Sequence, residues 1–109
     1  MKFPMTVYAL RNEVTGNLYV GRSVNPRARL MAHMNALKRG AHPVVDMQAD
    51  FDEYGDHFRF FVLDKIENWD ERGKELEWQK RLNTIDRRYG YNYRDPLVVH
   101  YGRAKVKRT

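Results

Sequence analysis

Four polar side chains in the first third of the sequence have types and spacings that suit catalysis. Tyr8 and Tyr19 lie on the two arms of a predicted hairpin, so their phenols can meet across it and share a partner. Arg29 and His33 are four residues apart, which places them one turn from each other on a predicted helix, beside its apolar stripe. Such groups can neutralise an anion and transfer a proton. The alternative for the two tyrosines is that they only cap the apolar body of a hairpin. The alternative for Arg29 and His33 is an ordinary solvent-exposed helix surface.

A carboxylate joins this set from a later helix. Glu75 precedes Trp78 by three residues and therefore lies on the same face as the core-directed side chains. An unpaired buried carboxylate is costly, so such a residue is normally paired, protonated or metal-bound. The alternative is a Glu at the fringe of the stripe that pairs with an Arg, and Glu77 is the nearest other acid. Asn92 follows Gly90 closely, and an Asn there is usually a turn residue.

The elements that must position these groups begin with a hairpin. Apolar residues around Tyr8 and around Tyr19 flank turn residues at Thr15-Gly16-Asn17. A third apolar run, 58–66, is rich in aromatic and β-branched residues and predicts a largely buried strand at the centre of the sheet. We therefore expect an α+β fold with a small three-stranded, at least partly antiparallel sheet flanked by about three helices.

Start and stop residues predict the three helices. Asn25 is the N-cap of the first, which runs over 26–39 and stops at Gly40. The second spans 43–54 and the third about 71–85. Apolar spacing defines one inward stripe in each, which comprises Leu30, Met34 and Leu37, then Val44, Met47 and Phe51, then Trp78, Leu82 and Ile85. Beyond Pro96, residues 97–99 are predicted as a short edge strand or docked extension.

Composition limits the class of protein. The 109 residues are enough for one domain with a modest core. The chain has no cysteine, which excludes disulfides and thiolate metal sites and fits a reducing cytoplasm. We find no signal peptide and no apolar run long enough to span a membrane, so the sequence predicts a cytoplasmic protein without membrane contact.

Charge is concentrated at the C-terminal end. Twenty Lys and Arg against fourteen Asp and Glu give a net charge of +6. Residues 94–109 hold five of the basic residues and one acid, so this end contributes +4 and the remainder only +2. A basic tail commonly follows a nucleic-acid backbone through counterion release. The alternative is a solvated terminus.

With these residues placed, the chain resembles the GIY-YIG endonuclease family over roughly residues 5–93. The two motifs are Thr6-Val7-Tyr8, with Thr for Gly and Val for Ile, and Tyr19-Val20-Gly21. The motifs alone are short, but six polar positions follow the family's order and make the resemblance specific. These positions are Tyr8, Tyr19, Arg29, His33, Glu75 and Asn92. The arrangement is similar to the nuclease module of phage-type homing endonucleases.

The resemblance implies a metal-dependent DNA endonuclease. One divalent ion, Mg²⁺ with Mn²⁺ as the alternative, would be bound by Glu75 with waters filling the other positions. Arg29 would neutralise the phosphate, and Tyr19 would position the phosphate or water. Tyr8 would be the general base, with its pKa lowered by Arg29 and the metal–water network, and His33 is the competing base. Asn92 would orient the site by hydrogen bonding.

The resemblance and the charge distribution together predict a nuclease domain, 1–96, and a basic tail, 97–109. DNA contacts are expected from a histidine that follows the first helix and from basic residues, which are His42, Arg22, Arg27, Arg103, Lys105, Lys107 and Arg108. Two alternatives stay open. One is a repair or restriction nuclease rather than a homing-type enzyme. The other is a nucleic-acid-binding protein that keeps the fold and does not cut.

Overall fold

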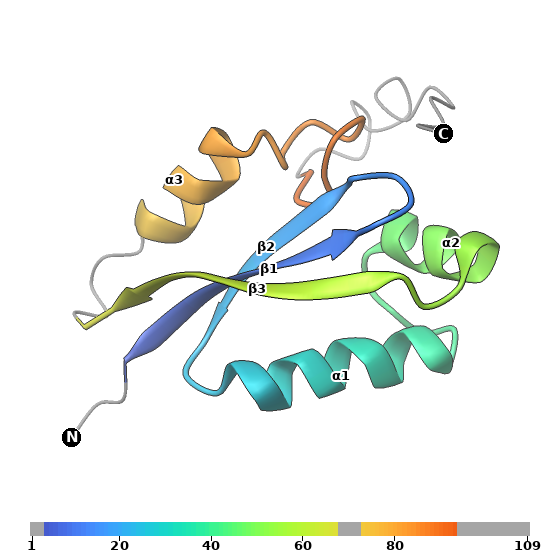
Figure 1. Ribbon diagram of the computed structural model, residues 1–109, viewed down its shortest axis with the longest axis horizontal. Coiled ribbons are helices and arrows are strands. Elements are labelled where there is room, and N and C mark those ends of the chain that lie inside the picture. Colours follow the sequence, from blue (N-terminus) through green and yellow to red (C-terminus); the bar gives the residue numbers. More distant parts are fainter. Residues whose placement is uncertain (1–3, 68–72, 94–109) are drawn as a thin grey trace.

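A three-stranded antiparallel sheet organises the chain in the computed structural model, which describes residues 4–67 and 73–93 (Figure 1). Strands β1 (Met5–Asn12) and β2 (Leu18–Ser23) form the predicted hairpin, and β3 (Phe58–Ile66) has the predicted bounds. The strand order is β2-β1-β3. The α+β prediction is thereby confirmed.

The predicted place of β3 at the centre of the sheet is wrong. Strand β1 is central, because it pairs with both β2 and β3. Residues 6–10 of β1 are all buried, whereas Val62 of β3 is 53% exposed. An apolar run predicts burial of a strand but does not say which strand has a neighbour on both sides, and that depends on tertiary pairing.

Helices α1 (Pro26–Lys38) and α2 (Val45–Tyr54) follow the predicted caps closely. The side-chain oxygen of Asn25 accepts a hydrogen bond from the backbone N–H of Ala28 at 3.2 Å, which satisfies a free donor of the first turn. Gly40, with φ of +71°, follows the end of α1. Helix α2 begins two residues later than predicted, because Val44 is its N-cap.

Helix α3 (Gly73–Arg81) is shorter than predicted at its C-terminal end. The expected end near Ile85 is wrong, because the chain turns at Asn83, which has φ of +57°. A left-handed residue stops a helix, and Asn is among the few side chains that tolerate it. The expected start near residue 71, the predicted strand 97–99 and the tail 97–109 lie outside the described residues.

The sheet separates two apolar clusters. The cluster on the α3 side has a buried centre composed of Val7, Ala9, Val20 and Ile66, and Trp78 and Leu82 pack against it. The cluster on the other side has a buried centre composed of Leu37, Met47 and Tyr91. In Figure 1, α1 and α3 lie on opposite sides of the sheet. Edge strand β2 contacts both helices, which makes it the place where groups from both can meet.

No helix among the described residues is long and apolar enough to cross a membrane.

Candidate active site

The two tyrosines of the hairpin lie on the sheet face that looks toward α1. Tyr8 pairs with Gly21 and Tyr19 pairs with Leu10, so the strand register places both phenols on one face. Their ring centroids are 6.3 Å apart. A Cβ atom on Gly21 would lie 2.6 Å from the Tyr8 hydroxyl oxygen and 3.0 Å from the Tyr19 ring. The absent side chain of Gly21 is therefore what lets the Tyr8 phenol lie across β2.

Helix α1 directs Arg29 and His33 at these phenols. The hydroxyl oxygen of Tyr8 lies 2.8 Å from Nε2 of His33. His33 is 6% exposed and is one of the two buried side chains of α1, so the wet-surface alternative does not hold for it. The guanidinium of Arg29 lies close enough to both phenols that they raise its pKa, and Tyr8 is the first cause of that rise. Arg29 and His33 thus both lie near the Tyr8 hydroxyl.

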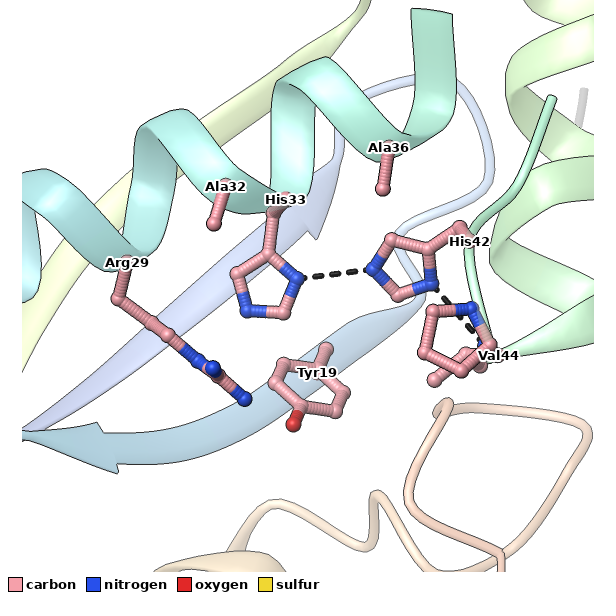
Figure 2. Close-up of a pocket in the computed structure, with 8 residues that line it drawn as sticks. Tyr19, Arg29, Ala32, His33, Ala36, His42 and Val44 are labelled. Atoms are coloured by element: carbon pink, nitrogen blue, oxygen red, sulfur yellow. Dashed lines mark hydrogen bonds between the residues drawn. The ribbon is translucent and has the colours of Figure 1, made fainter. Parts of the chain in front are cut away.

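His42 extends the Tyr8–His33 contact by one more side chain. Its Nε2 lies 2.8 Å from Nδ1 of His33, and its Nδ1 accepts a hydrogen bond from the backbone N–H of Val44 at 3.0 Å (Figure 2). Burial lowers the pKa of His33 to about 4 and also lowers the pKa of His42. Both rings are therefore neutral at pH 7. They line a pocket of about 140 Å³ together with Tyr19 and Arg29.

The pKa of Tyr8 departs from the sequence prediction. Burial, followed by the neighbouring Tyr19, raises the pKa of this phenol to about 12. Arg29 lowers the pKa as expected, but it does not outweigh the loss of hydration. The pKa of Tyr19 is also raised, first by burial. In the protein alone both phenols are therefore protonated at neutral pH.

Glu75 reaches the site from α3. Its Oε1 lies 3.4 Å from Nε of Arg22, and its side chain is 28% exposed. Arg22 pairs with Val7, which places it on the α3 face of the sheet. The Glu75 charge is close enough to raise the pKa of both Tyr8 and Tyr19. Glu75 and Arg29 thus act on the same two phenols from opposite sides of β2. Glu77 is more exposed and pairs with Arg81 instead.

The donor set fits a sparsely ligated hard cation. The part of the chain that the structure describes holds no cluster of three or more His, Cys, Asp or Glu side chains that could form a dedicated metal cage. Glu75 supplies one partly exposed carboxylate. Mg²⁺ is commonly bound by one or two carboxylates, substrate phosphate and several waters, so a single carboxylate beside a phosphate site suits it. A metal that needs several protein ligands does not fit.

Asn92 acts on the backbone of β2 rather than on the phenols. Its Oδ1 accepts a hydrogen bond from Val20 N–H at 2.7 Å, and its Nδ2 donates to the Val20 carbonyl at 2.9 Å. This side chain continues a short parallel bridge between Leu18 and Gly90. Asn92 thereby binds the outer edge of β2 between the two motif residues Tyr19 and Gly21.

The segment that carries Asn92 is docked on α2 by buried polar contacts. Arg87 donates to Asp46 at 2.7 Å, and the Tyr91 hydroxyl donates to Asp50 at 2.7 Å. Asp46 and Asp50 are 3% and 2% exposed. Neither aspartate could be predicted as buried from the sequence, because a helical period alone marks acids as outward-facing. Their burial is supported by partners that are 41 residues away in the chain.

Gln79 is a second positioning residue that the sequence analysis missed. It is 3% exposed and donates through Nε2 to the Val20 carbonyl at 3.3 Å. Gln79 follows Glu75 by four residues and therefore lies on the same face of α3. This hydrogen bond fixes the position of α3 along β2, and therefore the position of Glu75. Only the i, i+4 spacing from Glu75 pointed to it in the sequence.

The remaining predicted DNA contacts divide into three kinds. Arg27 is exposed on α1, as a backbone contact requires. His42 is 7% exposed and both of its ring nitrogens are engaged, so its position supports a role inside the site better than direct contact with DNA. The basic residues of the tail, Arg103, Lys105, Lys107 and Arg108, lie outside the described residues.

Comparisons with known proteins agree with this geometry. A sequence model of the GIY-YIG catalytic domain matches residues 4–92. Intron-associated endonuclease 1 of Enterobacteria phage T4 is 29% identical over 91 residues, which cover 82% of this chain and 36% of the phage protein. This chain thus spans about a third of the length of that relative.

Two solved structures share the fold. The catalytic domain of homing endonuclease I-TevI superposes with a TM-score of 0.75 at 26% identity, over 84% of this chain and 99% of that domain. A mutant of the catalytic domain of intron endonuclease I-TevI gives a TM-score of 0.71 at 27% identity, over 85% and 96% of the two chains.

Proposed function

Because this chain belongs to the GIY-YIG endonuclease family, we propose that it hydrolyses DNA phosphodiester bonds with the site built around Tyr8, Arg29 and Glu75. The observation that carries the proposal is the contact of the Tyr8 hydroxyl with His33 at 2.8 Å, beside a pocket lined by Tyr19 and Arg29. The Glu75 charge is close enough to raise the pKa of both phenols. Phosphodiester cleavage needs a positive charge to stabilise the phosphoryl oxygens and a group that accepts a proton from the attacking water. A carboxylate that can bind a metal ion helps to supply that charge.

Arg29 is the phosphate-binding residue in this proposal. Arg29 is exposed and lines the pocket beside Tyr19, close enough to the two phenols to lower the pKa of both. A guanidinium presents several donors in one plane, so Arg29 can contact a phosphoryl oxygen while it stays beside a tyrosine. Tyr19 lies beside it in the pocket and can position the phosphate or the attacking water.

Tyr8 is the proposed general base. In its phenolate form Tyr8 accepts a proton from the attacking water, whose oxygen bonds to phosphorus as the phosphorus–O3′ bond breaks. The departing 3′ oxygen takes a proton from solvent. The contact with His33 and the nearby positive charge of Arg29 stabilise the phenolate, which burial otherwise disfavours.

Glu75 is the proposed ligand of one divalent cation, Mg²⁺ or Mn²⁺. When bound, the cation would supply positive charge for the phosphoryl oxygens. Arg22 holds the Glu75 carboxylate in the protein alone, so the guanidinium must move aside for a cation to reach Oε1. Asn92 and Gln79 keep the edge strand between Glu75 and Arg29 in register.

The role of the whole protein is proposed to be of the homing type, with repair or restriction as the alternatives. The first test is cleavage itself. Purified chain is incubated with supercoiled plasmid in Mg²⁺ or in chelator, and nicked and linear forms are resolved on a gel. We expect Mg²⁺-dependent nicking. Plasmid binding without any nicking, in Mg²⁺ and in Mn²⁺, would favour the non-cutting alternative.

A further inference from the structure

Three side chains and one backbone amide form a continuous hydrogen-bonded chain beside the phosphate site. It runs from the Val44 N–H to Nδ1 of His42 at 3.0 Å, from Nε2 of His42 to Nδ1 of His33 at 2.8 Å, and from Nε2 of His33 to the Tyr8 hydroxyl at 2.8 Å. Figure 2 shows the two imidazoles in line, with Val44 at the outer end. Each imidazole nitrogen in the chain has one hydrogen-bond partner. Each bond contains one proton, so the direction of one bond restricts the direction of the next.

The amide at the end of this chain determines the direction of every bond. A backbone N–H can only donate, so Nδ1 of His42 must present a lone pair. Neutral His42 therefore carries its proton on Nε2 and donates it to Nδ1 of His33. Neutral His33 in turn carries its proton on Nε2 and donates it to Tyr8. The opposite direction would leave His42 with no proton on either nitrogen, which is an anionic imidazole.

Protonation does not change this order. A doubly protonated His33 would donate from Nδ1 to Nε2 of His42, and His42 would again have two acceptor nitrogens and no proton. A doubly protonated His42 would have no lone pair for the Val44 amide. Burial also disfavours the cation at both rings.

We propose that His42 and the Val44 amide are positioning groups that hold His33 in its Nε2–H tautomer, so that Tyr8 accepts a hydrogen bond from His33 and directs its own proton outward. The loop geometry supports this assignment. Pro43 keeps His42 extended, because the residue before a proline is restricted to that region. The backbone N–H of His42 donates to Gln48 of α2 at 3.0 Å, which ties the loop to the helix.

The consequence for catalysis rests on the proposed function. His33 has no free lone pair, since Nδ1 accepts from His42 and Nε2 bears the proton that faces Tyr8. His33 therefore cannot store the Tyr8 proton or act as the base itself. It stabilises the Tyr8 phenolate by donation, together with Arg29. The competition between Tyr8 and His33 for the role of base is thereby decided in favour of Tyr8.

The tautomers can be measured directly by NMR on the full chain without DNA. Long-range ¹H–¹⁵N correlation spectra of ¹⁵N-histidine protein near pH 7.5 distinguish Nε2–H from Nδ1–H rings. The chain has four histidines, so His57→Gln and His100→Gln identify the other two signals. We expect Nε2–H at both His33 and His42. An Nδ1–H tautomer at either ring overturns the inference.

Paired variants test the cause of the tautomer. Val44→Pro removes the N–H and should let His33 populate both tautomers, whereas Val45→Pro, at the first helical position where Pro is tolerated, should leave the spectrum unchanged. If Val44→Pro unfolds the chain, the His33 tautomer is measured in His42→Leu and His42→Gln instead. Gln keeps a donor for Nδ1 of His33 and should preserve Nε2–H, and Leu should not.

A His33 ring that stays Nε2–H in the Val44→Pro protein and in the His42→Leu protein overturns the inference. Single-turnover cleavage adds a separate readout, with an expected loss of roughly tenfold or more in His42→Leu and partial rescue in His42→Gln. The spectra contain no DNA, so a failed tautomer prediction and a failed nuclease assignment can be told apart.

Discussion

The Tyr8 phenol occupies the space that a side chain on Gly21 would fill, with its hydroxyl oxygen 2.6 Å from the position of a Cβ atom there. The glycine of the second motif therefore determines where the tyrosine of the first motif can lie. The two residues are paired across β1 and β2, so a change at one must move the other.

Gly21→Ala should impair catalysis by displacing Tyr8. We expect a loss of roughly 10²-fold in single-turnover rate, since a misplacement of about 1 Å has effects of that size. The crowded site should also lose about 1–3 kcal/mol of stability. Gly73→Ala is the matched control, because a Cβ there meets nothing within 4 Å. Parent-like cleavage by Gly21→Ala would show that the Tyr8 position is not required.

The pH dependence of cleavage should follow the Tyr8 phenolate. The pKa of Tyr8 is raised to about 12, so the deprotonated form is scarce at pH 7 and grows about tenfold per pH unit. The logarithm of the single-turnover rate should therefore rise with a slope near one across about pH 6–9. Tyr8→Phe should lose roughly 10²-fold or more and also lose this slope. A Tyr8→Phe protein with the same slope would assign the titration to another group.

Removing the Arg22 guanidinium should strengthen binding of a divalent cation to Glu75. The ion pair is about one third exposed, so it is worth at most about 1 kcal/mol, and Arg22→Gln should raise Mn²⁺ affinity by up to roughly fivefold. Affinity is measured from free Mn²⁺ by electron paramagnetic resonance without DNA. Arg81→Gln, which breaks the Glu77 pair on the same helix, should change nothing. Weaker Mn²⁺ binding by Arg22→Gln would contradict this account.

Local sequence rules predicted most of the elements. The caps at Asn25 and Gly40 and the turn residues between the apolar runs of β1 and β2 are properties of neighbouring residues, and the structure agrees with them. The centre of the sheet could not be predicted in this way. It depends on which strand pairs on both sides, and β1 and β3 are joined only through tertiary contact.

The sequence predicted a set of candidate site residues but not the contacts that join them. The order of Tyr8, Arg29 and Glu75 along the chain matches the family, yet nothing in the sequence indicates that Arg22 pairs with Glu75 or that Val44 ends the histidine chain. The prediction that Tyr8 has a lowered pKa was wrong for a similar reason. The sequence showed the nearby charge of Arg29 but not the depth of burial.

The basic tail is predicted to contact the DNA backbone without a role in chemistry. Deletion of residues 100–109 removes Arg103, Lys105, Lys107 and Arg108. The slope of log affinity against log salt should fall by up to roughly 3.6 if all four neutralise phosphates. The single-turnover rate at saturating DNA should hardly change, because the site residues end at Asn92. An unchanged slope over a salt series would make the tail a solvated terminus.

The central claim is that one carboxylate, Glu75, makes this domain a metal-dependent nuclease. The most direct measurement is single-turnover plasmid nicking in Mg²⁺ by Glu75→Ala and Glu77→Ala, with DNA affinity and melting temperature measured for both. Glu77 is the matched control, because it lies on the same helix, pairs with Arg81 and has a side chain that is 55% exposed. We expect Glu75→Ala to stay folded, bind DNA and fail to nick, and Glu77→Ala to nick at the parent rate. Nicking by Glu75→Ala at the parent rate would contradict the central claim.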